Sequence, residues 1–362
     1  MTGIYIHVPF CKRKCPYCDF YSVCRPELYE DYTQAVCRNI EAFKGRDIKC
    51  DTIYFGGGTP SVLSAEQVDR IIDTAGKCFE LCEPEITLEA NPSSVDMEKM
   101  SGWRKAGVTR LSFGVQSAND RELGFLGRLH DFSQAKSAVE TAAQVGFSHI
   151  SCDIMLGVKG QTLESLWDSL TALPVDHVSA YMLKIEKGTA FDCDEMRNAV
   201  ADDDMLCDMY LQTVGQLASK GFLQYEISNF AKEGGKSRHN LKYWHGEEYI
   251  GIGPSAHSFF ENERYYCKSD VEKFISDKVQ SMVVLEDDPD KAEEYVMLGL
   301  RLTEGIDIGK AEELGGKELG DNIRKKEAMF QKQGLCMVKN GVLRLTPAGF
   351  LASNSIIGEL LW

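Results

Sequence analysis

Short apolar segments alternate with amphipathic segments through the first two thirds of the chain, and this alternation constrains the fold most. The segments predicted to be strands are residues 4–8, 52–55, 86–90, 110–115, 149–156 and 177–183. Between them, apolar residues recur at helical spacing, which predicts helices from Pro26 onward and over residues 65–78, 96–106, 133–145 and 162–173. Six successive β-then-α units indicate an α/β protein with a parallel sheet and right-handed crossovers.

Unusual polar residues stand where these strands end. Gly56–Thr59 follow the second strand, Glu89 lies on the third, Gln116 follows the fourth, and Asp153 lies towards the end of the fifth. In a parallel barrel all strand C-termini meet on one rim, which carries the chemistry. A doubly wound open sheet gives the same alternation, but no G-x-G-x-x-G follows the first strand. We therefore expect a partial parallel (β/α)6 barrel, similar to a TIM barrel.

The pattern changes after about residue 202, and we expect three regions: a core over 1–230, a connecting segment over 231–288 and a small C-terminal domain over 289–362. The last has helical patterns at 291–302 and 321–334, two short strands joined by Asn340-Gly341, and a closing helix after Thr346-Pro347. Asn-Gly is a strong tight-hairpin signal. The order of elements is similar to a winged helix, which predicts a small α+β module.

Charge argues against a nucleic-acid partner. Lys and Arg number 40 against 55 Asp and Glu, which gives a formal charge of −15, and no block of basic residues is present. Binding to a polyanion requires a basic surface, so we interpret the C-terminal module as a packing or lid domain. The N-terminus lacks the pattern of a signal peptide, and no apolar run reaches the ~20 residues of a membrane span. A soluble, cytoplasmic protein is therefore expected.

Three of the thirteen cysteines, Cys11, Cys15 and Cys18, lie within eight residues directly after the first predicted strand. Thiolates are the usual ligands of an iron–sulfur cubane, and three of them leave one iron free to bind another molecule. A structural zinc site would need a fourth ligand, for which His7 and Cys24 are the nearby candidates. We favour a [4Fe–4S] cluster.

The residues around these cysteines carry a family resemblance. Residues 5–20 read YIHVPFCKRKCPYCDF, and further shared motifs are YFGGGTPS (54–61), LEANP (88–92), RLSFGVQS (110–117), LGRLH (126–130), ISCDIMLG (150–157), YEISNFA (225–231), HNLKYW (239–244) and GIGPSAHSF (251–259). This ordered set closely resembles the coproporphyrinogen oxidase-like branch of the radical S-adenosylmethionine (SAM) superfamily, and within it the heme chaperone HemW group. The resemblance covers nearly the whole chain.

The resemblance implies that SAM chelates the free iron of the cluster. Positions that match the SAM-binding motifs are Tyr5, Tyr17, Gly57, Gly58, Thr59, Glu89, Gln116, Arg128 and Asp153. These residue types suit the ligand, since glycines allow close backbone approach, a guanidinium pairs with a carboxylate, and carboxylates accept from an ammonium or from ribose hydroxyls. For Glu89 and Asp153 a helix cap or a salt bridge on the barrel rim is the structural alternative.

For function, the resemblance implies a heme chaperone that passes heme to apo-hemoproteins such as respiratory enzymes, with an electron donor and with membrane contact only through the recipients. Whether SAM is cleaved, and hence whether the chain is an enzyme, is left open. The alternatives are oxygen-independent coproporphyrinogen III oxidase, or another tetrapyrrole-modifying protein such as a methyltransferase or a heme-degrading enzyme. The oxidase has a CxxxCxxCxC loop, whereas this chain has Phe20 at the last position and only ten residues before the loop.

The HNLKYW motif suits heme chemically. His239 is a candidate axial ligand, and Tyr243 and Trp244 offer flat apolar contact to a macrocycle. A buried loop in which His239 satisfies backbone groups is the structural alternative, and His257 is a second candidate ligand. One departure from the family is Lys159, where relatives often have Pro in GLPGQT; we interpret it as a solvated side chain.

Overall fold

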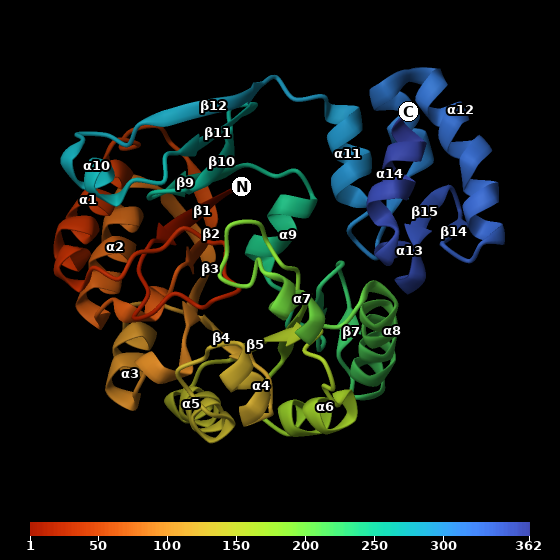
Figure 1. Cartoon of the computed structure of the whole chain (residues 1–362). Coiled ribbons are helices and arrows are strands. Elements are labelled where there is room, and N and C mark those ends of the chain that lie inside the picture. Colours follow the sequence, from red (N-terminus) through yellow and green to blue (C-terminus); the bar gives the residue numbers. More distant parts are fainter.

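Six parallel strands form the centre of the molecule in the computed structural model, which describes residues 1–362. They are β1 (Thr2–Val8), β2 (Lys49–Gly57), β3 (Glu80–Ala90), β4 (Arg110–Gln116), β5 (His149–Leu156) and β6 (His177–Met182). They pair in sequence order (Figure 1). This order confirms the predicted partial (β/α)6 barrel. Strands that are buried on both faces have near-continuous apolar sequences, which is why these six were recognisable in the sequence.

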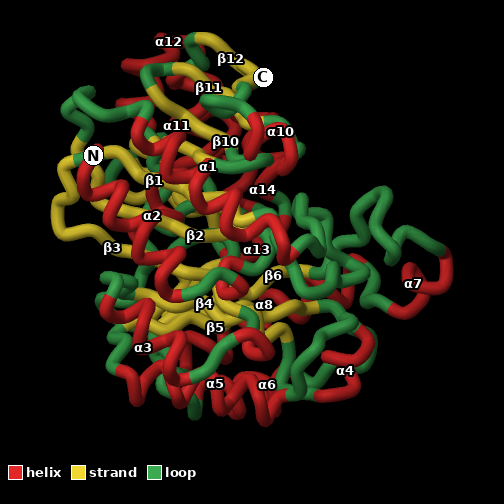
Figure 2. Tube along the Cα trace, turned by 90° about the vertical axis from the view of Figure 1, so that its left-hand side faces the viewer, coloured by secondary structure: helices red, strands yellow, loops and turns green.

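Helices cover the outer face of these strands (Figures 1 and 2). They are α1 (Tyr29–Glu41), which follows a 3-10 turn at Pro26–Leu28, α2 (Ala65–Cys78), α3 (Met97–Lys105), α4 (Asp120–Phe125), α5 (Phe132–Val145) and α6 (Leu163–Thr171). Reciprocal capping boxes, Ser64 with Gln67 and Asp131 with Gln134, begin α2 and α5. The short α4 was not predicted.

The segment 231–288, predicted as a connecting segment, extends the sheet on the β1 side. β9 (Tyr249–Ile252) pairs parallel with β1, and β10 (His257–Phe260), β11 (Glu263–Cys267) and β12 (Met282–Asp287) continue the sheet antiparallel. On the β6 side β8 (Asn229–Ala231) and β7 (Leu223–Gln224) complete twelve strands. Two helices, α7 (Asp194–Ala199) and α8 (Asp203–Ser219), precede this segment, and two more, α9 (Arg238–Trp244) and α10 (Val271–Ser276), lie within it.

The C-terminal module is the predicted small α+β unit. It comprises α11 (Lys291–Gly299), β13 (Ile306–Asp307), α12 (Ile308–Lys332), β14 (Cys336–Lys339), β15 (Val342–Leu345), α13 (Pro347–Leu351) and α14 (Ser353–Leu361). Asn340 and Gly341 have φ of 55° and 78°, the double positive φ of a type I′ turn, so the hairpin prediction is confirmed. The helix predicted over 321–334 is the second of two helical segments that make up α12. The first segment begins at Ile308, and the two join at a kink at Gly316.

Two separate hydrophobic cores follow from this architecture. The larger lies between the sheet and its helices, and 15 buried residues form the core of the C-terminal module, to which α8 contributes Tyr210. The two parts meet where the backbone of Glu226 bridges to Leu302 and the Thr303 N–H donates to the Tyr225 carbonyl at 3.1 Å. None of the helices combines the length and apolar character that a membrane span requires.

Candidate metal centre and cofactor site

The loop that carries the three cysteines is pinned at both ends. The Cys11 N–H donates to the Val23 carbonyl at 3.1 Å, and the Val23 N–H donates to the Pro9 carbonyl at 2.8 Å. Between them, the Cys18 N–H donates to the Cys15 carbonyl at 3.1 Å. Because the loop leaves the C-terminal end of β1, it lies on the rim of the barrel, as predicted.

Two of the cysteine sulfurs accept hydrogen bonds from residues in other loops, one after β2 and one between α4 and α5. Thr59 Oγ1 donates to Cys11 Sγ at 3.3 Å, and Arg128 Nη1 donates to Cys15 Sγ at 3.4 Å. All thirteen thiols are free, and these three are partly buried. No group of three or more His, Cys, Asp or Glu side chains is gathered around one single-ion position. Three partly buried thiols on one loop are the ligand type that an iron–sulfur cluster takes.

Glycines let β2 end directly against the base of this loop. A Cβ on Gly57, which has φ of 105°, would lie 2.6 Å from the His7 ring, and a Cβ on Gly58 would lie 2.7 Å from the Phe10 carbonyl oxygen. The Gly58 N–H donates to the Val8 carbonyl at 2.9 Å. These close contacts show that only glycine fits at positions 57 and 58, where β2 meets the base of the loop.

Two carboxyl groups share the lumen next to the loop. Glu89 accepts from Tyr54 Oη at 2.8 Å, and Asp153 accepts from Ser112 Oγ at 3.1 Å. Burial, with the neighbouring Asp153, raises the pKa of Glu89 to about 7, and burial raises the pKa of Asp153 to about 6. Neither carboxyl caps a helix or pairs with a cation across the rim, so the structural alternatives considered for them do not apply.

Buried polar atoms without a partner mark the adjoining wall. The side-chain oxygen of Gln116 and Nε of Arg128 are buried without a hydrogen bond, while Arg128 Nη2 donates to the Gly114 carbonyl at 2.7 Å. Gln116 also has φ of 71°, a strained conformation for a residue with a side chain. A Cβ on Gly114 would lie 3.1 Å from both side chains. Unsatisfied buried groups are costly, so this wall is suited to a polar ligand.

The two predicted tyrosines flank the site. Tyr5 Oη is 3.2 Å from His7 Nδ1, and the other ring nitrogen of His7 is 3.1 Å from the Tyr21 carbonyl. Burial lowers the pKa of His7 to about 4, so its ring is neutral at pH 7. His7 is therefore a structural support of the loop. Tyr17, on the other side, packs against Phe191, with ring centroids 6.1 Å apart.

The sequence reasoning missed Tyr54 and Ser112, although strand alternation contains the signal. Residues two apart on a strand face the same side, so Tyr54 shares a face with Gly56, and Ser112 shares one with Gly114 and Gln116. Ser112 is also in register with Glu89 on the neighbouring strand.

The sequence matches known families along its whole length. A model of the radical SAM superfamily matches residues 5–173, and a model of the HemN C-terminal domain matches residues 287–352. The heme chaperone HemW of Bacillus subtilis is 34% identical over 379 residues, which cover 100% of this chain and 99% of that protein. The chain belongs to the HemW family. Escherichia coli HemW is 39% identical over 265 residues, 70% of this chain and 69% of that protein.

Among solved structures, coproporphyrinogen III oxidase (HemN) from Escherichia coli superposes on this HemW-family chain with a TM-score of 0.81 and 19% identity, covering 99% of this chain and 90% of that one. At this identity the likeness shows the shared fold. The radical SAM fold, with its small C-terminal domain, is confirmed.

The HNLKYW segment of this HemW-family chain forms α9, which closes the N-terminal end of the barrel. Glu85 accepts the N–H groups of Arg238 and His239 at 2.8 and 3.3 Å. His239 is fully buried, its Nδ1 lies 2.8 Å from Thr52 Oγ1, and its Nε2 lies 2.8 Å from Tyr243 Oη. Burial lowers its pKa to about 3. Both ring nitrogens are engaged, so in this conformation the predicted axial ligand offers no nitrogen to an iron.

The neighbouring aromatic residues have distinct partners. Tyr243 packs edge-on against His239 and Tyr249, with ring centroids 5.1 and 4.6 Å apart. Trp244 lies near Glu226, a buried carboxyl whose pKa burial raises to about 7. The second candidate ligand, His257, is exposed at the start of β10 and stacks on Tyr266 at 5.4 Å. Unlike His239, it needs no rearrangement to reach a ligand.

Lys159 is exposed, as predicted, and it also makes two hydrogen bonds. Its Nζ donates to the Asn198 carbonyl and its backbone N–H to the Ala199 carbonyl, both at 3.3 Å. These contacts hold the end of α7, in the segment that projects from the body of the molecule in Figure 2. A proline at this position would remove the backbone donor.

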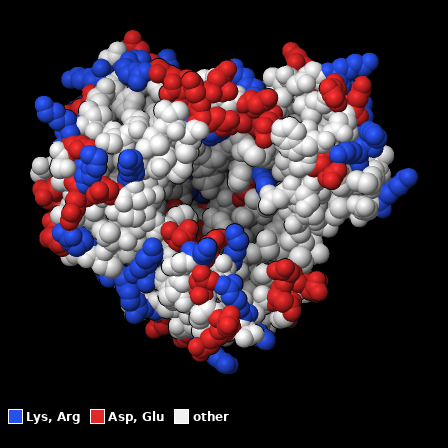
Figure 3. All heavy atoms as spheres, turned by 45° about the horizontal axis from the view of Figure 1, so that its top comes forward, with Lys and Arg blue, Asp and Glu red and all other residues white.

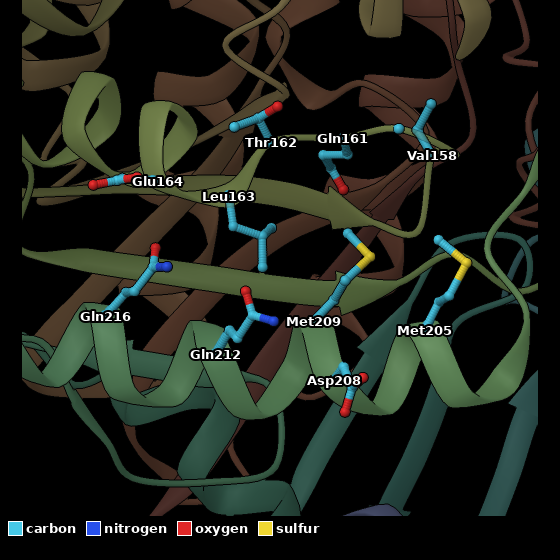
Figure 4. A pocket seen from close by; sticks show the side chains of 11 residues that line it. Val158, Gln161, Thr162, Leu163, Glu164, Met205, Asp208, Met209, Gln212 and Gln216 are labelled. Carbon is cyan, nitrogen blue, oxygen red and sulfur yellow. The ribbon is translucent and has the colours of Figure 1, made fainter.

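A hollow of about 490 Å³ lies away from the predicted site residues, between α6 and α8 (Figure 4). Met205, Met209 and Gln212 line it from α8, and Thr162 and Leu163 line it from the start of α6. It contains none of the residues discussed above as cluster, SAM or heme ligands.

Proposed function

We propose that this chain is a heme chaperone that carries a [4Fe–4S] cluster on Cys11, Cys15 and Cys18, binds SAM on the barrel rim, and delivers heme to apo-hemoproteins such as respiratory enzymes. The observation that carries the proposal is the similarity to relatives named heme chaperones over practically the full length of both chains. The site supports it, since three thiols, two of them hydrogen bonded, lie beside a wall of unsatisfied polar groups.

When bound, the cluster and SAM supply one-electron reductive chemistry at the sulfonium. The protein's own side chains hold the cofactor. The Arg128 guanidinium would pair with the carboxylate of SAM, Gln116 Oε1 would accept from a polar hydrogen, and Glu89 and Asp153 would accept from the ammonium or the ribose hydroxyls. The raised pKa values of both carboxyls mean that a cationic ligand draws them into the ionised form on binding.

The heme site has two candidate axial ligands. His239 binds iron only after its hydrogen bonds to Thr52 and Tyr243 open, whereas the ring of His257 is exposed. Tyr243 and Trp244 supply flat contact in the first case, and Tyr266 does so in the second. Figure 3 shows that one face of the molecule is hollowed at its centre.

A second candidate function is coproporphyrinogen III oxidase, which the shared fold favours. Phe20 stands where the oxidase loop has its fourth cysteine, and this argues against it.

A heme-transfer assay separates the two functions. Anaerobically reconstituted protein is loaded with heme and mixed with an apo-hemoprotein, and in parallel it is incubated with coproporphyrinogen III, SAM and a reductant. We expect stoichiometric heme transfer and no protoporphyrinogen. Protoporphyrinogen formed over many turnovers, without heme transfer, would contradict the chaperone function.

Heme titration of matched variants identifies the ligand. His239→Ala, His257→Ala and, as a control at the opposite end of β5 from the rim, His149→Ala are titrated with heme and followed by absorption spectroscopy. Loss of an axial nitrogen shifts the Soret band and weakens binding at least tenfold, about 1.4 kcal/mol. Wild-type spectra in both His239→Ala and His257→Ala would exclude both ligands.

A further inference from the structure

The large sheet ends in an edge strand whose apolar side chains are exposed. β12 is the last of the twelve strands and pairs with β11 alone. Its residues Met282, Val284 and Leu285 are 41%, 56% and 56% exposed. An edge strand presents a row of backbone N–H and C=O groups without partners, so an exposed apolar edge is a template for another strand. We call residues 282–285 the β12 edge.

The buried face of the sheet continues onto the β12 edge and becomes exposed there. Met282 and Val284 pair with Cys267 and Tyr265 of β11, both of which are buried. Residues directly opposite each other on paired strands lie on the same face of a sheet. Pairing is regular through residues 282–284, and Leu285 is the extra residue at a bulge. A regular stretch of apolar strand therefore lies at the edge without cover.

Acidic side chains follow the β12 edge directly. Glu286, Asp287 and Asp288 come after Leu285 and are exposed, and Glu263 lies opposite Asp287 on β11. None of the ion pairs in the structure includes these four carboxylates. Like charges directly opposite each other destabilise a strand pair. A cation bound here would relieve that repulsion. We call these four carboxylates the acidic end.

We propose that the β12 edge binds an extended, basic segment of a partner protein as a thirteenth strand. Backbone hydrogen bonds to β12 hold the segment, its apolar side chains cover Met282 and Val284, and its Lys or Arg side chains pair with the acidic end. β9 to β12 pair antiparallel with one another. A further antiparallel strand carries its basic residues in its N-terminal half. The proposal does not depend on the cluster, SAM or heme.

A basic protein segment fits the β12 edge better than other occupants do. Nucleic acid and anionic lipid have the same sign of charge as the acidic end, which repels them. A second copy of this chain carries a formal charge of −15 and is repelled at long range. The remaining alternative is an edge without a partner, in which the bulge and the acidic end serve to keep other strands away. The experiment distinguishes these cases.

The test uses a fluorescent synthetic peptide, Lys-Arg-Lys-Val-Thr-Val-Thr-Val-Thr, and the full-length protein, with binding followed by anisotropy. Two versions of the peptide carry N-methyl groups on alternate residues, which block hydrogen bonding along one of its two edges. An added strand pairs through one edge. We therefore expect one version to bind like the parent and the other at least tenfold more weakly. A version with Glu in place of the three cations should also bind at least tenfold more weakly.

An edge variant and its control locate the site on the apolar side chains. The edge variant changes Met282 and Val284 to Ser, and the control changes Met97 and Met329, which are similarly exposed on helices, to Ser. We expect the edge variant to bind the peptide at least tenfold more weakly and the control to match wild type. In wild type, bound peptide should slow hydrogen exchange in β12 and leave β1–β6 unchanged.

A charge variant tests the acidic end separately. It combines Glu286→Gln, Asp287→Asn and Asp288→Asn, and its control changes three exposed carboxylates elsewhere, Glu233, Glu313 and Glu318, to Gln. We expect the charge variant to bind at least tenfold more weakly at low salt, with the difference lost in 0.5 M salt, because salt screens exposed charges.

Four results would overturn the proposal. The first is no saturable binding of the parent peptide, and the second is equal binding of the two N-methyl versions, which excludes strand pairing. The third is wild-type binding by the edge variant. The fourth is a dimer of the chain alone in analytical ultracentrifugation that the edge variant loses, which assigns the edge to a second copy.

Discussion

At the scale of single residues, the sequence located the rim residues because strand ends in a parallel barrel converge. Cys11, Glu89 and Gln116 reach one rim as predicted. The environment of His239 could not be read in the same way. Its partner Thr52 lies 187 positions away in sequence, and nothing local to HNLKYW indicates that both ring nitrogens are already engaged.

Glu89 gives a prediction for stability against pH. Its pKa in the folded protein is about 7, above its ordinary value of 4.5, so the folded state favours the protonated form. The stability that this protonation contributes is present below pH 4.5 and is lost as the pH rises through 7. Glu89→Gln removes that loss. We expect the unfolding free energy of cluster-free Glu89→Gln, measured by urea denaturation, to exceed that of wild type by about 3 kcal/mol at pH 8 and to be similar at pH 4.5.

The control for this measurement is Glu313→Gln, on an exposed position of α12. A constant difference between Glu89→Gln and wild type across the pH range would show that Glu89 is not the titrating group.

At the scale of elements, the six central units were predictable because each is a local pattern of apolar spacing, whereas the added strands were not. β9 has only four residues, and its place beside β1 depends on pairing Gly3 with Tyr249 across most of the chain. In α12 the non-helical Gly316 interrupts the helical pattern, so the segment from Ile308 was not recognised. Short strands and kinked helices are defined by tertiary contacts that a local window does not contain.

The buried ion pair below the barrel gives a prediction for α9. Glu85 and Arg110 are 7% and 2% exposed and 3.1 Å apart, and Glu85 also accepts the first N–H groups of α9. Glu85→Ala leaves the Arg110 charge buried without its partner and frees the start of α9. We expect a loss of about 3–5 kcal/mol in unfolding free energy, measured by urea denaturation.

The matched control is Glu83→Ala, an exposed residue two positions earlier on the same strand. If Glu85→Ala costs no more than this control, the ion pair does not anchor α9.

At the scale of the whole molecule, two hydrophobic cores share a joint at Glu226–Leu302 and the side chain of Tyr210. The sequence indicated the change of pattern near residue 202 and the small C-terminal unit. It could not indicate that part of 231–288 belongs to the same sheet as β1, since strand order is a property of the whole sheet rather than of any segment.

The separate core gives a prediction about local opening. Leu343 is fully buried in the C-terminal module, and Leu343→Ala should cost about 2–5 kcal/mol. We expect hydrogen exchange to quicken over α11–α14 and α8 while the strands β1–β6 keep their protection. The control is Leu285→Ala, at a position that is 56% exposed. A uniform loss of protection across the barrel strands would show that the two cores open as one unit.

The central claim is that three thiolates on the rim hold a cubane whose free iron binds SAM against Arg128, Gln116 and the two carboxyls. The most direct test is electron paramagnetic resonance of the anaerobically reconstituted, reduced protein with and without SAM, together with iron and sulfide analysis. The account predicts about four irons and four sulfides per chain, lost when Cys11, Cys15 and Cys18 are changed to Ala, and a cluster signal that shifts on addition of SAM. A single bound zinc ion, or a cluster signal that SAM leaves unchanged, would contradict it.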